Sequence, residues 1–227
     1  MKRTIRLLVL LLGAAVPGAA LAASATPVQV SVWPPIQIVS EDWDVDGLRL
    51  TLPFGVNRDV AGLDLGLANI VLSTASGVQA GLLWNEAACA NGAQLSPVFN
   101  YANVLRGLQV AVGVNNADDV SGLQVAPILN TAITDLQGIQ LAVGGNHADT
   151  VHGVQAALLN HCERMYGAQI GPMYNYATRM HGVQVGLINY SRRASGIQFG
   201  LLNFMQDGPL PFFPLINLDF SARPAEQ

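Results

Sequence analysis

Hydrophobic and polar residues alternate between residues 60 and 207 in a pattern that recurs about every 15 residues. Each unit has a glycine, a glutamine two residues later, a small residue four after the glycine, and a closing asparagine; Asp64 replaces glutamine in the first unit. Apolar residues flank the glutamine, and this period of two predicts β-strands and not helices. The repeat glycines are Gly62, Gly77, Gly92, Gly107, Gly122, Gly138, Gly153, Gly167, Gly182 and Gly196.

Two folds use units of this length. In a β-solenoid each unit is one coil, and successive coils stack in parallel about 4.8 Å apart. In an up-and-down outer-membrane β-barrel each unit is one strand with one turn, and neighbours are antiparallel.

The prolines and the repeated amides favour the solenoid. Pro97, Pro127 and Pro172 each follow the small residue, where a corner between two short strands tolerates a missing N–H. Parallel stacking places glutamine above glutamine and asparagine above asparagine, so that each amide hydrogen-bonds along its column. We therefore predict an all-β solenoid of about ten 14–16-residue coils with non-repeat caps, and keep the barrel as the alternative.

The solenoid gives each repeat position a task. We expect the apolar residues beside glutamine, such as Leu123 and Val125 or Ile139 and Leu141, to fill a narrow interior. The small residue forms the corner, some glycines adopt positive φ, and asparagine stands at a turn, where it tolerates left-handed backbone.

The segments outside the repeat define the domain organisation. Basic residues, an apolar stretch and the small residues of Ala20-Leu21-Ala22 mark residues 1–22 as a cleaved signal peptide. Residues 23–59 are then an N-terminal cap, 60–207 the repeat domain and 208–227 a C-terminal cap and tail. The predicted location is extracytoplasmic: the outer membrane, the cell surface or the periplasm.

Charge and hydropathy limit the classes of partner that the chain can bind. Beyond residue 22 there is no lysine, and eight arginines against 15 acidic residues leave a formal charge of −7. So few cations argue against nucleic acid and against adsorption to an anionic membrane. No segment after residue 22 approaches 18 consecutive apolar residues, so a transmembrane helix is not expected.

The units, h-x-G-h-Q-h-(G/A)-h-h-N-x-A with h apolar, support a family resemblance. Together with the opening Val28-Gln29-Val30-Ser31-Val32-Trp33-Pro34-Pro35 and the ending Gly200-Leu201-Leu202-Asn203-Phe204, they resemble exported surface-repeat proteins of Gram-negative bacteria. The resemblance implies a cell-surface or extracytoplasmic location and repetitive β-structure. It implies no activity and no catalytic residues.

Two groups of side chains are candidate sites. Asp42, Asp44 and Asp46 match the opening of a calcium loop, although Pro53 replaces the glutamate of an EF-hand, and the other interpretation is a solvated acidic segment. A file of rings follows the closing asparagines, and we read it either as a binding stripe for a glycan or as an aromatic ladder that stabilises the stack. Its members are His147, His161, Tyr176, Tyr190 and Phe204.

Few other side chains are candidates for a disulfide, for catalysis or for binding a cofactor. Cys89 and Cys162 lie five coils apart, about 24 Å under stacking, so we expect two unpaired thiols. Glutamine and asparagine are neither general acids nor bases, and we expect no cofactor. The sequence predicts a non-enzymatic exported structural or interaction protein whose partner is an unidentified protein or glycan at the cell surface. The alternatives are an integral outer-membrane barrel and a glycan-acting enzyme, which needs clustered carboxylates.

Overall fold

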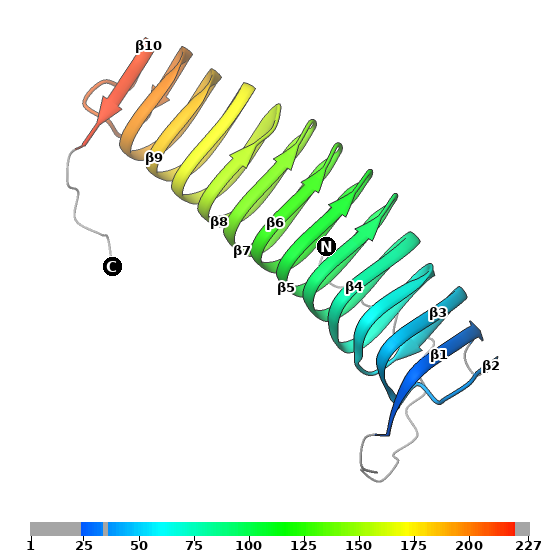
Figure 1. Cartoon of the computed structure of the whole chain (residues 1–227). Helices are drawn as coiled ribbons and strands as arrows, with labels where there is room; N and C mark the ends of the chain where they lie inside the picture. Colours follow the sequence, from blue (N-terminus) through cyan, green and yellow to red (C-terminus); the bar gives the residue numbers. More distant parts are fainter. Residues whose placement is uncertain (1–23, 34–35, 221–227) are drawn as a thin grey trace.

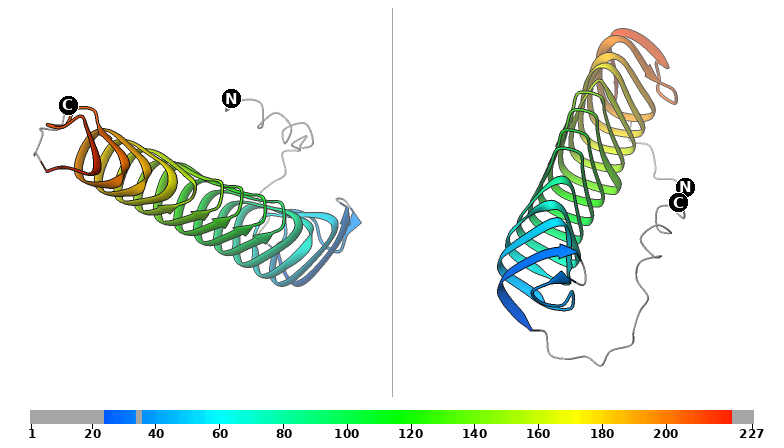
Figure 2. Two further views of the ribbon diagram at one scale, coloured as in Figure 1. Left: turned by 90° about the horizontal axis from the view of Figure 1, so that it is seen from above. Right: turned by 90° about the vertical axis from the view of Figure 1, so that its right-hand side faces the viewer.

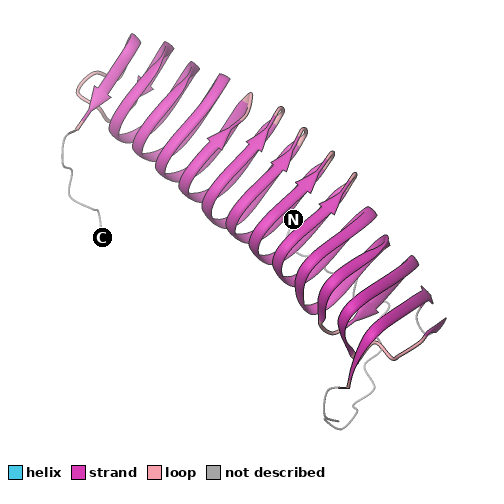
Figure 3. Ribbon diagram, in the orientation of Figure 1, coloured by secondary structure: helices cyan, strands magenta, loops and turns pink. Residues whose placement is uncertain are grey.

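The computed structural model describes residues 24–33 and 36–220, and there the chain winds into one elongated stack of β-coils (Figure 1). The described residues form strands and connecting bends without a helix (Figure 3). The predicted signal peptide, residues 1–22, and the last seven residues of the tail lie outside the described residues.

The strands follow one another along a single sheet that coils around the axis of the stack. They are β1 (Ala25–Trp33), β2 (Ile36–Gln37), β3 (Asp44–Asn57), β4 (Val60–Ser96), β5 (Phe99–Ala111), β6 (Val114–Ala126), β7 (Leu129–Ala142), β8 (Gly145–Ala156), β9 (Leu159–Met205) and β10 (Phe212–Asp219). The long elements β4 and β9 each pass through several coils, because the chain turns corners there without leaving the extended conformation.

Successive coils pair in parallel and in the register of the repeat. Between β5 and β6, for example, Gly107 lies opposite Gly122 and Gln109 opposite Gln124. The predicted solenoid is confirmed. The up-and-down barrel is wrong as a fold, since it requires antiparallel neighbours.

The stack extends beyond the ten repeats at its N-terminal end. Within the segment predicted as a cap, Gly47 of β3 lies opposite Gly62, so that β3 adds an eleventh coil in register. Strand β1 pairs in parallel with β3, and β2 folds back on β1. At the other end β10 runs antiparallel to the last coil of β9 and covers its edge (Figure 2).

Two of the three predicted proline corners are found as bends between strands, whereas Pro172 lies within the long strand β9. Strand β4 ends at Ser96 and the chain bends at Pro97, and the same bend follows β6 at Pro127. Backbone N–H groups of the next coil donate to both proline carbonyls, including Val112 N to Pro97 O at 3.2 Å. Proline therefore keeps its acceptor role at a position where its missing donor is not needed.

The repeat glycines have a precise backbone role. Gly138 has φ of 146°, and the other repeat glycines also have positive φ, as expected for some of them. A Cβ at Gly138 would overlap the carbonyl oxygen of Gly122 in the preceding coil. Glycine is required there both by conformation and by the close approach of two backbones.

The interior is the reverse of the one predicted. Gln124 and Gln140 are completely buried, whereas Ile139 and Leu141 beside Gln140 are 42% and 39% exposed. The prediction that apolar residues flanking glutamine fill the interior is therefore wrong. Alternation with period two separates two sets of side chains, but by itself it does not say which set faces inward.

A ladder of glutamine amides runs the length of this interior. The Nε2 of each glutamine donates to Oε1 of the glutamine one coil earlier, as from Gln124 to Gln109 and from Gln140 to Gln124, both at 2.8 Å. At its N-terminal end Gln79 donates to the carboxylate of Asp64, which also pairs with the buried Arg49 at 2.6 Å. The ladder bonds satisfy the buried amides, except Oε1 of Gln198 at the C-terminal end, and so offset the cost of removing them from water.

A second ladder, of asparagines, runs in the opposite sense. Asn115 donates from Nδ2 to Asn130 Oδ1 at 3.0 Å in the following coil and to the backbone oxygen of Val125 at 2.8 Å. The predicted amide columns are thus confirmed. The left-handed turn expected for asparagine is not observed: Leu215 is the non-glycine residue with positive φ in the described part of the chain.

Hydrophobic side chains fill the rest of the interior. They form two columns, one two residues before each repeat glycine and one two residues after each closing asparagine, where Ser191 is the polar exception. Leu105, Leu136 and Met165 belong to the first column, and Ala102 and Ala132 to the second. A glutamine also bridges the two walls of its coil, since Gln124 Nε2 reaches the carbonyl oxygen of Thr131 at 3.3 Å.

Candidate interaction face

Because the amides face inward, the apolar residues beside them form a surface that we call the aliphatic face. It consists of the positions one, three and five residues after the repeat glycine in the eleven coils from Gly47 to Gly196. All 33 of these positions carry Leu, Val, Ile, Ala, Pro or Phe, and none is buried. The face therefore has no polar side chain in its three columns.

The end strands continue this face at both edges of the stack. Val28 and Val30 of β1 lie opposite Leu48 and Leu50 of β3 and are 45% and 40% exposed. At the other end Ile216 and Leu218 of β10 lie opposite Phe199 and Ile197. Thirteen strand segments in all thus contribute aliphatic side chains to one continuous surface.

The size of the face can be taken from strand geometry. Thirteen segments about 4.8 Å apart and four residue steps of about 3.3 Å give roughly 60 by 13 Å, or about 800 Å². The largest apolar patch of an ordinary monomer is about 300–600 Å². An exposed apolar surface above that range is typical of an interaction site.

A shallow hollow of about 570 Å³ lies in the N-terminal part of the face, and Val30, Leu50, Leu52, Leu65 and Leu82 are among its lining residues. The lining is mostly aliphatic, and its two polar side chains, Ser31 and Thr51, are buried, so the hollow offers little to orient a small ligand. The face as a whole is better suited to a broad apolar partner than to a bound metabolite.

The predicted ring file lies on a different side of the coils, after the asparagine ladder. The ring centroids of His147 and His161 are 5.0 Å apart, those of His161 and Tyr176 4.7 Å, and those of Tyr176 and Tyr190 5.3 Å. The ring of Phe204, the fifth member, packs against that of Phe212 of β10, with the centroids 5.0 Å apart. His161 and Tyr176 are each stacked between two other rings, so both faces of these rings are covered.

This stacking favours the aromatic ladder over the glycan stripe, because sugars pack on ring faces. Burial, followed by the neighbouring His147, lowers the pKa of His161. The Nδ1 atoms of the two histidines are 3.0 Å apart, so one ring donates and the other accepts when both are neutral. A second file is formed by His152, Tyr166 and His181, with centroid distances of 4.9 and 5.1 Å.

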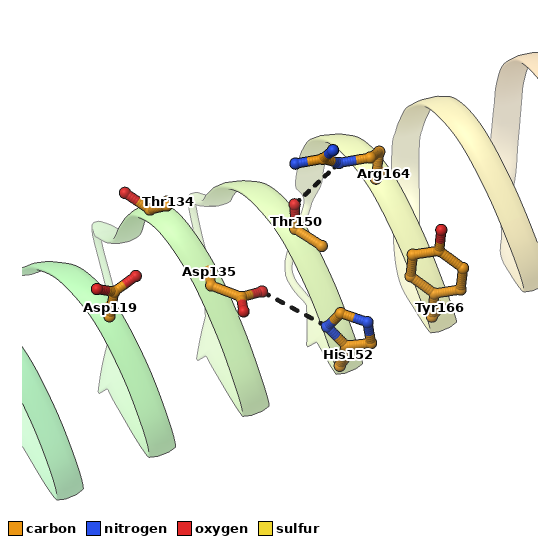
Figure 4. A pocket seen from close by; sticks show the side chains of 7 residues that line it. All are labelled: Asp119, Thr134, Asp135, Thr150, His152, Arg164 and Tyr166. Atoms are coloured by element: carbon orange, nitrogen blue, oxygen red, sulfur yellow. Dashed lines mark hydrogen bonds and ion pairs between the residues drawn. The ribbon is translucent and has the colours of Figure 1, made fainter. Parts of the chain in front are cut away.

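A polar hollow of about 420 Å³ adjoins this second file (Figure 4). Asp135 Oδ1 is 3.5 Å from His152 Nδ1, and Arg164 Nε donates to Thr150 Oγ1 at 3.1 Å. Asp119 lies opposite Asp135 at the equivalent position of the adjacent coil, whereas the contact of Asp135 with His152 joins non-equivalent repeat positions that the sequence alone did not bring together. The His152 side chain is 51% exposed, so water competes for each polar contact in this hollow.

The three carboxylates considered for calcium are not brought together as a site. Asp44 accepts two hydrogen bonds from Arg58 Nη2, at 2.6 and 2.7 Å, while Asp42 and Asp46 are exposed. Among the described residues no group of three or more His, Cys, Asp or Glu side chains is arranged to hold a metal ion.

The two cysteines are free, and they belong to different columns as well as to distant coils. Cys162 lies in the interior column with Ala148 and Ala177, and burial raises the pKa of its thiol to about 12. Cys89 is half-buried in the segment between a closing asparagine and the next repeat glycine, which we call the polar side of the coil. There Arg106 Nη1 lies 3.3 Å from its sulfur.

The described residues contain no helix that is long and apolar enough to cross a membrane. Comparison with known protein families, with curated proteins and with solved structures gives no match to this chain.

Proposed function

We propose that this chain is a non-enzymatic exported interaction protein, and that the aliphatic face is the surface through which it binds. The observation that carries the proposal is the inverted pattern of the coils: amides inside, aliphatic side chains outside. A chain that needed its apolar residues only for folding would bury them, because exposure forfeits about 25 cal/mol per Å².

The interior suits a rigid scaffold. Two hydrogen-bonded ladders and parallel backbone pairing hold each coil to the next, so the outer columns stay aligned over the length of the stack. Regular positions of this kind define a flat, repetitive surface. They supply neither an enclosed site nor an acid and base at fixed positions within one.

Export is the second part of the proposal. It rests on the signal-peptide pattern of residues 1–22 and on the resemblance of the repeats to exported surface-repeat proteins. Fractionation of cells that express the full chain, with mass determination of the product, tests it. We expect a chain shortened by about 22 residues outside the inner membrane; a full-length cytoplasmic product would refute export.

Retention on a phenyl resin tests the face. The double variant Leu95→Glu/Leu141→Glu places two charges on it, and its matched control, Leu72→Glu/Ile133→Glu, places two charges on the polar side. We expect the first variant to elute at clearly higher salt than the wild type and the second to elute with it. Equal retention of all three when each is applied as a monomer, with unchanged circular dichroism, would show that the face is not the accessible apolar surface.

A further inference from the structure

We infer that the partner of the aliphatic face is a second copy of this chain, packed face to face with the two solenoid axes antiparallel. This inference rests on the proposed function and names the partner for the same surface. It is carried by the area of the face, by the shape of a β-sheet surface, and by the distribution of charge.

The area agrees with that of a stable protein interface. A standard interface buries about 800 Å² on each partner, and the face offers about 800 Å² by its strand geometry. Its three columns contain only apolar side chains, which resembles the core of an obligate homodimer and not the mixed surface of a transient complex.

The geometry of the columns suits a second sheet of the same kind. Outward side chains stand about 4.8 Å apart along each column, and two sheets pack about 10 Å apart with their side chains interleaved. The columns contain both small and large residues, as in Ala156, Ile170 and Val185 three residues after their glycines. A two-fold axis perpendicular to the stack places unlike coils opposite each other and lets a large side chain meet a small one.

Charge favours this partner over an anionic lipid surface. An amphipathic element that binds such a surface has lysine and arginine around its apolar side. Beyond residue 22 this chain has no lysine, and several of its eight arginines are already paired: Arg49 with Asp64, and Arg58 with Asp44.

The charge is also uneven along the stack, and this sets the orientation. Residues 24–150 contain 11 acidic residues and three arginines, a formal −8, whereas residues 151–220 contain three acidic residues and four arginines, a formal +1. The acidic segment spans the first seven of the eleven coils, so parallel packing would place it beside its copy along its whole length. Antiparallel packing places its first coils beside the weakly basic end of the other copy.

Sedimentation velocity of the mature protein tests the association. We expect twice the monomer mass at micromolar concentration, and an unchanged dimer for the control Leu72→Glu/Ile133→Glu. The dimer of Leu95→Glu/Leu141→Glu should be weaker by roughly 100-fold or more, because unpaired carboxylates would be buried in the interface. A monomeric wild type would overturn the inference, and so would a dimer that only the control substitutions weaken.

Cross-linking with a short bis-maleimide tests the orientation, in a Cys89→Ser background that leaves the buried Cys162. The coil of Gly122 is the sixth of eleven, so antiparallel packing brings Val125→Cys next to the same residue of the second copy. Val185→Cys should not cross-link to itself but should cross-link to Leu65→Cys in a mixture. Efficient self-linking of Val185→Cys would refute the antiparallel arrangement.

The failure of this inference is distinguishable from the failure of the proposed function. A monomer that floats with phosphatidylcholine vesicles, and loses that binding in the face variant only, overturns the second copy as partner and leaves the interaction face in place. A monomer that neither floats nor differs from the face variant on phenyl resin overturns both.

Discussion

The buried glutamine ladder should contribute measurably to stability, and Gln124 near the centre of the stack is the place to test it. Its Nε2 donates to Gln109 Oε1 at 2.8 Å and to the Thr131 carbonyl oxygen at 3.3 Å, and its Oε1 accepts from Gln140 at 2.8 Å. In Gln124→Leu a side chain of similar size fills the space but makes none of these bonds.

The magnitude follows from the groups left behind. Gln109 Oε1 loses its donor and Gln140 Nε2 loses its ladder acceptor, at about 1–3 kcal/mol for each buried unsatisfied group. The leucine regains about 1–2 kcal/mol by removing apolar surface from water. We therefore expect Gln124→Leu to lower the free energy of unfolding by about 1–4 kcal/mol.

Urea unfolding followed by circular dichroism measures this change. The control Ser121→Leu adds the same side chain to an exposed position of the same coil and should change the free energy of unfolding by about 0.5 kcal/mol or less. If Gln124→Leu were as stable as the wild type, the interior would tolerate a plain hydrophobic column, and the ladder would not explain why glutamine is buried.

The variant Gln124→Glu extends the test through pH. Burial beside the Gln109 oxygen should raise the folded-state pKa of the new carboxyl above its unfolded value of about 4.3. A raised pKa means that the folded state holds its proton longer, so the stability deficit relative to wild type should be smallest below about pH 4 and should grow as pH rises through the unfolded pKa towards the folded one. A deficit equal at pH 4 and pH 7.5 would contradict this reasoning.

Three further outcomes follow from the structure. Gly138→Ala should lower the free energy of unfolding in urea by about 2–4 kcal/mol, because it combines a φ of 146° with a backbone overlap. In the control Gly145→Ala the new Cβ would lie 3.4 Å from its nearest atom, and the loss should be about 1 kcal/mol or less. Iodoacetamide at pH 8 should add one label to the native protein, at the half-buried Cys89, and two after unfolding, since the buried Cys162 thiol has a pKa raised to about 12; two rapid native labels would refute its burial. The pKa of His161 is lowered in the folded state, so the free energy of unfolding should fall as pH drops below the unfolded-state pKa of about 6.5. The variant His161→Tyr should therefore lose less stability than the wild type between pH 7.5 and 5. An equal or larger loss in the variant would contradict this reasoning.

Much of the fold could be predicted from the repeat itself. Ten units of 14–16 residues, Pro97 and Pro127 after a small residue, and amides at equivalent positions are satisfied together only by stacked parallel coils. The ring file was also visible, since the residues after each asparagine are separated by one repeat. By contrast, the contact of Asp135 with His152 joins non-equivalent positions of adjacent repeats, and it depends on how the columns of side chains adjoin around a coil, which linear spacing does not define.

The sequence by itself determined the coil length, the corners and the two columns of identical amides. Only the tertiary structure decided which side of the alternation faces inward. The reason is the width of the coil: Gln124 spans it to the Thr131 carbonyl and also meets the glutamines above and below, so that the amide is fully used inside. With the interior occupied by amides and small apolar residues, Ile139 and Leu141 lie on the outside, where they form the face that we propose for binding.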